Sequence, residues 1–425
     1  MEKSISVVPC RVAILLALAL LGSLIVGLLV GCDGQGDAGG GAIGAQEPES
    51  VVVLVGNHAN APQAQVYPQV RELLQAATQT RGYVAFVSVE GTPRLVDGAI
   101  VGSDAPTQRV RADENEGWIE GLSTILSSNI AAKTPESDPL EALRLANRTL
   151  ASAPAGLHHI VVIDSGLATV GPISFTQEDM IYAWPKDVAS YLDSIDALIA
   201  FDEGVTVDWY GLGDVASPQA ALTSHQRNSL RDIWTEIIER SGATVIFHDD
   251  PPTAQTLDGL PAVSSIDLEG DPLPEIVDMQ EPIIFDESVL HFWPDTADFI
   301  DQQDAEALLG PYAELLAAHP EIHVHLIGTT ATFGSPNADE DSYELSRQRA
   351  QKVYDVLVSL GAPPEQMETE GQGSFDRWHL DEYDEQGNYL PQVAAQNRKV
   401  VMVEKSTPHD CVLDPASRNQ APGSD

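Results

Sequence analysis

From about residue 51 to residue 250, two patterns of hydrophobic positions alternate along the chain. Short uninterrupted runs rich in Val and Ile are typical of strands buried on both faces of a sheet, and they lie at residues 51–55, 84–89, 160–163, 205–210 and 244–247. Stretches with helical spacing separate them, at residues 67–80, 117–133, 139–151, 186–198 and 218–241. This alternation of strand and helix predicts a doubly wound, mostly parallel α/β sheet.

A second pattern begins near residue 282 and predicts a smaller α+β domain. A helix is expected at residues 304–319, with a kink at Gly310-Pro311, and a strand at residues 323–327. The fold class predicted for the whole chain is therefore α/β plus α+β.

The next helix of this second domain is predicted to begin at Asp341, which forms a capping-box pattern with Glu344. It should end at Leu360, because Gly361 follows. Its expected buried stripe consists of Val353, Val356, Leu357 and Leu360. Arg349 lies at the N-terminal end of that stripe, and we expect its side chain to reach towards the loop after the strand at residues 323–327.

Three segments lack the periodicity of a packed element. Residues 32–50 are rich in Gly, Ala and Gln and predict a flexible spacer. Residues 251–280 contain five prolines and predict a partly extended linker between the domains. Residues 406–425 predict a disordered tail.

The first 31 residues have the features of an export signal. Lys3 and Arg11 provide the positive start, and an uncharged apolar run occupies residues 12–30. Residues 29–32 read Leu-Val-Gly-Cys, which resembles a lipobox and implies cleavage before Cys32 and acylation of its thiol, a palmitate-type anchor. The alternative is an uncleaved membrane helix, since about 17 to 25 apolar residues suffice to span a bilayer.

Composition limits the possible partners. The 425 residues, 43% of them hydrophobic, can form two domains with separate cores. The formal net charge is −42, and it would be −43 without residues 1–31, which hold one acidic and two basic residues. Nucleic acid is therefore excluded as a partner, because its binding rests on Lys and Arg. Of the three cysteines Cys10, Cys32 and Cys411, the last would remain alone, so no disulfide framework is expected.

Two motifs near the C-terminus resemble a known family. Residues 345–350 read Leu-Ser-Arg-Gln-Arg-Ala, and residues 397–400 read Asn-Arg-Lys-Val. They resemble the outer-membrane-protein-A-like (OmpA-like) domain, whose pattern also has Gly-His-Thr-Asp after a strand. Thr329 and Ala331 stand at the His and Asp positions of that pattern. The resemblance implies a βαβαβ domain at residues 281–405 that associates with peptidoglycan.

In that family, the signature Arg takes the carboxylate of the wall stem peptide's diaminopimelate, and the signature Asp takes its ammonium group. Arg349 keeps the first role, for which its planar fork is suited. Ala331 leaves the ammonium without its partner, a loss of about 1.5–3 kcal/mol. An acidic residue of the following loop either replaces that partner or is simply solvated. The candidate ligand-binding residues are Arg349, Thr330, Asp339, Asn397 and Arg398.

Residues 51–250 have looser motifs that resemble a von Willebrand factor A-like domain. That family holds a divalent cation through Asp-x-Ser-x-Ser after the first strand, a Thr in a later loop and an Asp before a Gly. Asp164 is one residue out of register with that last Asp. Because hard cations need carboxylate ligands, we predict no metal ion and no cofactor. The corresponding positions hold Gly56, His58, Asn60, Thr134 and Ser165.

These observations predict a tether or scaffold, lipid-anchored in the cell membrane and facing the cell wall or periplasm. Its OmpA-like domain would bind a peptidoglycan stem peptide, weakly or with altered specificity, and its first domain an envelope or surface protein. No Gly-x-Ser-x-Gly or His-Glu-x-x-His motif is present, so we predict that it is not an enzyme. The alternative is a surface protein-protein interaction module that has lost wall binding.

Overall fold

The structure is a computed structural model that describes residues 47–128, 130–268, 281–332 and 339–408. The predicted signal peptide, the lipidation residue Cys32 and most of the predicted tail lie outside the described residues. In the described part of the chain, no helix is both long enough and apolar enough to cross a membrane.

A six-stranded sheet forms the core of the first part of the chain. Its order is β3-β2-β1-β4-β5-β6, and all neighbouring strands are parallel except β3, which runs antiparallel to β2 at the edge. This order is that of a doubly wound sheet, whose reversal point lies between β1 and β4. The strands are β1 (Glu49–Val55), β2 (Tyr83–Ser88), β3 (Arg94–Ile100), β4 (Leu157–Ile163), β5 (Thr206–Tyr210) and β6 (Thr244–His248).

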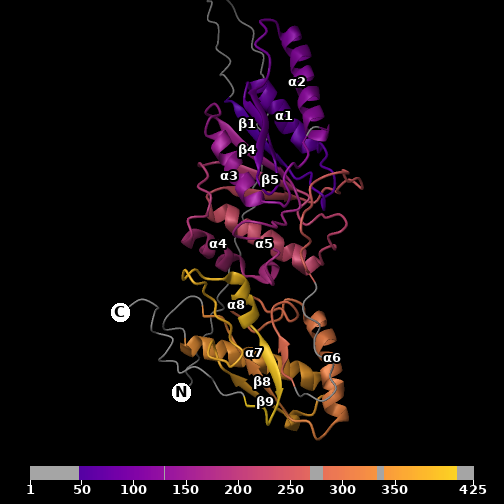
Figure 1. Cartoon of the computed structure of the whole chain (residues 1–425), viewed down its shortest axis with the longest axis vertical. Helices are drawn as coiled ribbons and strands as arrows, with labels where there is room; N and C mark the ends of the chain where they lie inside the picture. Colours follow the sequence, from indigo (N-terminus) through magenta and orange to yellow (C-terminus); the bar gives the residue numbers. More distant parts are fainter. Residues whose placement is uncertain (1–46, 129, 269–280, 333–338, 409–425) are drawn as a thin grey trace, which may run out of the picture. The chain divides into compact units, whose positions relative to one another are not determined.

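Helices cover both faces of this sheet, so the predicted doubly wound arrangement is confirmed (Figure 1). One face of β1 packs with α1 (Pro68–Thr80) and α2 (Gln108–Ser128) in one apolar cluster. The opposite face packs with the other three helices in a second cluster. These are α3 (Pro139–Leu150), α4 (Pro185–Ser194) and α5 (Ser224–Arg240), with the short 3-10 helix η1 (Met180–Tyr182) before α4.

Two features of this region differ from the sequence prediction for a common reason. Strand β3 was not predicted, because most of its residues are exposed and show no buried run. Helix α2 begins at Gln108, nine residues before the predicted start, in a segment that is mostly charged or polar. Hydrophobic periodicity does not detect elements that bury so little apolar surface.

A mixed four-stranded sheet forms the core of the second part, in the order β7-β10-β8-β9. Strand β10 is antiparallel to β7 and β8, whereas β8 and β9 are parallel and joined through α7. The strands are β7 (Ile283–Phe285), β8 (Val324–Gly328), β9 (Met367–Gly371) and β10 (Val400–Glu404). The helices are α6 (Gln302–Ala318), α7 (Asp339–Ser359) and α8 (Pro391–Asn397), with the 3-10 helix η2 (Pro364–Gln366).

Helix α7 corrects two expectations. It begins at Asp339, so Asp341 lies inside the helix and does not cap it. It ends at Ser359, and Leu360, predicted to be buried, is 37% exposed. Helix α6, for which an interruption at Gly310-Pro311 was predicted, runs across Pro311 as one helix.

The predicted spacer and linker are also more ordered than expected. Ser50 belongs to β1 and is fully buried. Residues 251–268, the described part of the segment expected to be a partly extended linker, form no helix or strand, but two of their side chains, Val263 and Ile266, are buried. Ile266 is buried in an apolar cluster of the first sheet, and its amide donates to Gln219 Oε1 over 2.7 Å. The amide of Glu136 likewise donates to Ala262 O.

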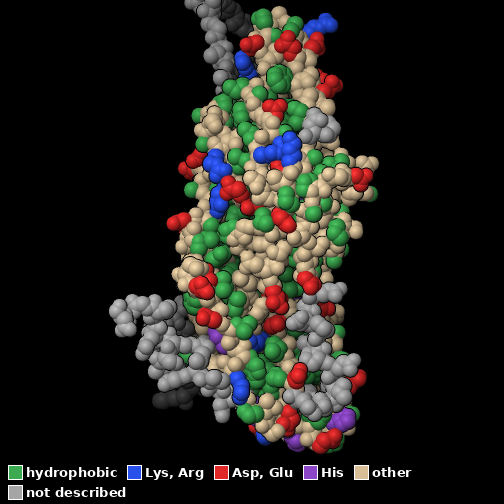
Figure 2. Space-filling model, in the orientation of Figure 1, with side chains coloured by type: hydrophobic (Ala, Val, Ile, Leu, Met, Phe, Trp, Pro, Cys, Tyr) green, Lys and Arg blue, Asp and Glu red, His purple; other side chains and the backbone are tan. Residues whose placement is uncertain are grey.

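Acidic side chains are spread over the face shown in Figure 2 and do not gather in one patch.

Two paired glycines let helix α7 approach the second sheet closely. Gly328 of β8 pairs with Gly371 of β9. A Cβ on Gly328 would lie 1.8 Å from the backbone oxygen of Ser346 in α7, and a Cβ on Gly371 would lie 2.5 Å from the backbone nitrogen of Arg347. The hydroxyl of Ser346 in turn accepts from the amide of Gly373. The first turns of α7, which carry the family motif, are thus held against the ends of two strands.

We predict that Gly328→Ala lowers the free energy of unfolding by about 2 kcal/mol, because the new methyl group meets backbone that cannot move aside cheaply. The control is Gly310→Ala in α6, where a Cβ would meet nothing within 4 Å. It should stabilise by up to about 1 kcal/mol through helix propensity. Urea unfolding midpoints measure both changes, and equal effects of the two substitutions would contradict the close-approach argument.

Candidate functional site

Arg349, the signature arginine of the family motif, is 1% exposed. Its Nε donates to the carbonyl oxygen of Thr296 over 2.9 Å, and its guanidinium lies 5.0 Å from the ring centroid of Phe292. Its Nη2 has no hydrogen-bond partner within the described residues. The side chain therefore bonds to the segment before α6, whereas the sequence predicted that it would reach the loop after β8.

The loop after β8 is held by backbone and hydroxyl contacts. Thr329 donates through Oγ1 to the carbonyl oxygen of Asn397 over 2.6 Å. The amide of Thr330 donates to Gly373 O over 2.8 Å, while its buried Oγ1 has no hydrogen bond in the described structure. Thr330 thus lines the junction of the loop with β9 and is 6% exposed.

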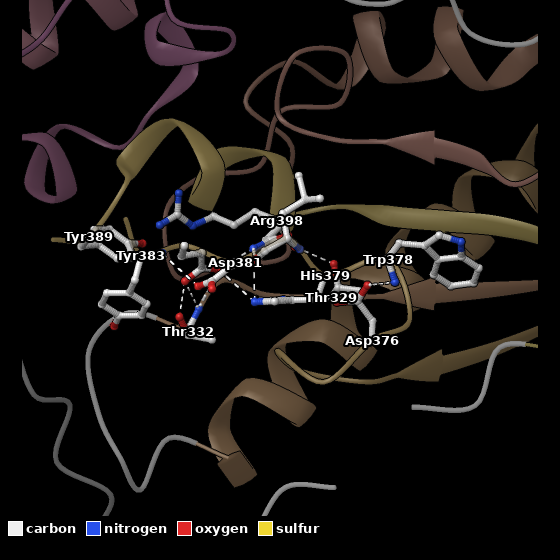
Figure 3. A network of polar contacts seen from close by, with 12 residues as sticks. Thr329, Thr332, Asp376, Trp378, His379, Asp381, Tyr383, Tyr389 and Arg398 are labelled. Carbon is white, nitrogen blue, oxygen red and sulfur yellow. Dashed lines mark hydrogen bonds and ion pairs between the residues drawn. The ribbon is translucent and has the colours of Figure 1, made fainter. Parts of the chain in front are cut away.

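Glu382 supplies a carboxylate beside this loop, and the sequence analysis did not identify it. Its oxygens accept from the amide of Thr332 over 2.8 Å and from the hydroxyl of the same residue. They also accept from the side-chain amide of Asn397 over 2.7 Å. The imidazole of His379 lies 3.6 Å from Glu382, in the polar network that Figure 3 shows around Thr329, Thr332 and His379. The carboxylate of Glu382 is thus buried and bonded to Thr332, the residue after Ala331. Ala331 stands at the position where the family has its acidic residue.

Asn397, the last residue of α8, is fully buried and joins three parts of this network. Its Oδ1 accepts from the amide of Leu380 over 2.9 Å, and its Nδ2 donates to Leu380 O as well as to Glu382. All of these partners belong to the second sheet's own domain. Asn397 therefore supports the loops around the candidate site.

Arg398 lies in a cluster of buried charges that spans both sheets' domains. Its Nη2 donates to Asp187 of α4, and its Nη1 lies 3.6 Å from Glu287 Oε2. Its guanidinium stacks 3.7 Å from the ring centroid of Trp184. The indole nitrogen of Trp184 donates to Glu287 Oε1 over 2.7 Å. We call Asp187, Glu287, Arg349 and Arg398 the charge cluster.

The charge cluster contains two carboxyl groups and two guanidinium groups, all of them buried. Burial opposes the charge on Arg398, but the nearby Glu287 and Asp187 outweigh it and raise the pKa of the guanidinium. Burial lowers the pKa of Arg349 to about 10, which still leaves it charged at neutral pH. Burial also raises the pKa of Glu287 to about 7, against the attraction of Arg398 and Arg349. Of this cluster, the sequence analysis found the arginines but neither carboxylate.

Most of the acidic loop after β8 lies outside the described residues. Asp339 begins α7, and its side chain lies outside the described part of the structure, so its predicted role stays a prediction. Glu344 pairs with Arg347 on the exposed face of the helix over 2.7 Å. That pairing lowers the pKa of Glu344 to about 2.

In the first domain, the candidate cation position is filled by side chains. His58 is buried between Asn60 and Asp164, with Nδ1 2.8 Å from Asn60 Oδ1 and Nε2 2.9 Å from Asp164 Oδ2. A Cβ on Gly56 would lie 1.9 Å from that same Asp164 oxygen. The imidazole and the carboxylate thus occupy the reversal point of the sheet, where doubly wound folds bind ligands.

The remaining two positions of the cation-binding pattern, Thr134 and Ser165, form local hydrogen bonds. Thr134 Oγ1 accepts from the amide of Thr92, and Ser165 Oγ accepts from the amide of Leu167. Among the described residues, no group of three His, Cys, Asp or Glu side chains has the arrangement of a metal site.

Comparison with known proteins agrees with the second domain's motifs. Residues 291–387 match the OmpA family and form an OmpA family domain, which confirms that predicted resemblance. No curated protein matches the chain. The von Willebrand factor A-like resemblance of residues 51–250 stays a prediction.

Solved structures resemble about a third of the chain or less. The peptidoglycan-associated lipoprotein from Burkholderia pseudomallei is 30% identical, over 27% of this chain and 88% of that chain, with a TM-score of 0.22. The OmpA-like domain of FopA1 from Francisella tularensis is 18% identical, over 28% of this chain and 69% of that chain, at 0.23. The periplasmic domain of Helicobacter pylori MotB is 18% identical, over 31% of this chain and 77% of that chain, at 0.24.

We predict that Asp187→Ala lowers the free energy of unfolding by about 3 kcal/mol, because it removes one partner of a buried ion pair and leaves Arg398 undercompensated. Asp193→Ala is the matched control on the same helix, since it breaks an exposed pair with Arg240. We expect it to cost less than about 1 kcal/mol. Denaturant unfolding of both variants distinguishes the two cases. A small effect of Asp187→Ala would show that Arg398 does not depend on α4.

Proposed function

We propose that this chain is a cell-envelope protein whose OmpA family domain associates with peptidoglycan through the stem peptide. The observation that carries the proposal is the OmpA family match at residues 291–387 together with the retained Arg349 in its motif. The neighbouring Arg398 adds a second guanidinium that suits a carboxylate. Envelope proteins with a similar domain include a peptidoglycan-associated lipoprotein.

Binding in this proposal is weak in the parent protein for two reasons. Ala331 offers no carboxylate to the ligand's ammonium group, and Glu382, whose carboxylate bonds to the adjacent Thr332, already accepts hydrogen bonds from Thr332 and Asn397. In addition, Asp187 holds Arg398 in the same way that a ligand carboxylate would. The stem peptide therefore competes with α4 for the arginines.

A second candidate function is favoured by that same contact. The arginines of the charge cluster serve a contact with α4 and Trp184 in the described structure. A domain whose signature arginines are used in this way is less available to a wall ligand and can serve as a protein-docking unit. This is the protein-protein interaction alternative, and in it wall binding is lost.

The first domain and the membrane anchor complete the proposal. We infer that residues 51–250 contact an envelope or surface protein, that the chain faces the wall or periplasm, and that it has no enzymatic activity. We also infer that Cys32 carries a lipid anchor, on the strength of the lipobox-like residues 29–32.

The full chain in detergent should sediment weakly with diaminopimelate-containing sacculi. Ala331→Asp should raise its affinity by about tenfold to a hundredfold, because it restores a charged partner for the ammonium. Asp187→Asn should also raise the bound fraction, because it weakens the competitor for Arg398. The control Asp193→Ala should change nothing.

Thermal unfolding confirms that each of these variants is folded before the comparison is made. If neither the parent nor Ala331→Asp sediments with sacculi, the wall-binding proposal is wrong, and the docking alternative takes its place.

Mass spectrometry of the exported protein tests the anchor. We expect a mature N-terminus at Cys32 with the mass of attached acyl chains, and Cys32→Ala should abolish both the cleavage and the added mass. An intact residue 1–31 segment on the parent protein would support the uncleaved membrane helix instead.

A further inference from the structure

A cavity of about 300 Å³ lies next to the charge cluster, and none of the functions discussed above uses it. This volume is at the lower end of the range for small-molecule sites. Its walls come from η1 and the start of α4, from α5, and from the segment between β7 and α6. The residues that matter for its chemistry are Tyr182, Trp184, His225, Asp232, Glu287 and Trp293.

Aromatic rings form most of the distinctive lining. Tyr182 stacks on His225 with ring centroids 6.1 Å apart, and His225 contacts His291 at 3.7 Å. Trp293 is 54% exposed at the rim, an unusual position for a large apolar side chain. Such rings offer negative faces to a bound cation.

Carboxylates provide the polar part of the lining. Glu287 is 5% exposed, and its Oε2 forms no hydrogen bond with the described residues, although Arg398 Nη1 lies 3.6 Å away. Asp232 lies at the outer part of the wall, where burial raises its pKa. Both groups would be stabilised as anions by a positive charge placed between the rings.

No fixed positive charge lines the cavity to oppose such a ligand. Among the described residues that form its wall, none is Lys or Arg. Burial lowers the pKa of His291 to about 3 and also lowers that of His225, so both imidazoles are neutral at pH 7. Arg398 and Arg349 lie behind Trp184 and Phe292, against whose rings they pack, and are balanced by Asp187 and Glu287.

We propose that this cavity binds a small organic cation, namely an alkylated or quaternary ammonium group, between its aromatic walls and its two carboxylates. The methyl groups would contact Tyr182 and Trp293. Asp232 would balance the charge, with a further contribution from Glu287, which Arg398 and Arg349 also attract. An inorganic cation fits less well, because the wall offers few oxygen ligands and much apolar surface. The inference can be tested separately from peptidoglycan binding, since Trp293 and Asp232 of the cavity wall belong neither to the family motif nor to the charge cluster.

Choline is the probe, and calorimetry on the full chain in detergent at pH 7.5 is the measurement. We expect saturable binding at one site per chain. The neutral isostere of choline, in which carbon replaces the quaternary nitrogen, should bind at least about tenfold more weakly, because it lacks the charge that the rings and carboxylates recognise. Equal affinity for both compounds would overturn the proposal.

Two substitutions locate the site. Trp293→Ala and Asp232→Asn should each weaken choline binding by about twofold to fivefold, and their exposed positions leave the fold intact. The control is Trp118→Ala, which removes another exposed Trp, on α2, and should change nothing. Unchanged affinity in both cavity variants, or absence of saturable binding to the parent protein, would refute the site. Binding of N-acetylglucosamine in place of choline, weakened by Trp293→Ala, would also refute the cation proposal by assigning the cavity to a neutral sugar.

Discussion

The buried pairing of Arg398 with Asp187 and Glu287 is the constraint on which the second half of this structure depends. Removing an ion from water costs several kcal/mol even after relaxation, so each of these charges is tolerable only while its partners are present. Asp187 belongs to α4, whereas Arg398 follows α8. The two bonded residues are 211 positions apart along the chain. Loss of any one member leaves an uncompensated charge in the interior.

This constraint changes what the family motif means in this chain. An arginine that faces solvent is free to bind a ligand carboxylate, whereas Arg398 is already bonded to the carboxylate of Asp187. The side of the site that faces the motif loop is similarly occupied, because Glu382 is bound by Thr332 and Asn397. Any wall ligand must therefore displace interactions within the protein, so its net affinity is the difference between two similar energies.

Much of the fold could be predicted from the sequence, but the candidate site could not. The buried strands of the first sheet and the helix carrying Arg349 produce strong periodic signals, because they bury apolar residues on regular faces. The edge strand β3 and the packing of Ile266 onto the first core give no such signal. For the site, the motif identified Arg349, Asn397 and Arg398, yet nothing in the spacing of Glu382 or Asp187 marked them as neighbours of that motif.

The sequence by itself determined most strands of the first sheet and the OmpA family motif, since these follow from local periodicity and from short runs of residues. Only the tertiary structure decided whether the motif's side chains are free. Burial and pairing depend on residues far away along the chain, and a carboxylate at position 187 or 382 looks the same in the sequence whether it is solvated or buried. Close approach, as at Gly328 against Ser346, likewise becomes visible only once the chain is folded.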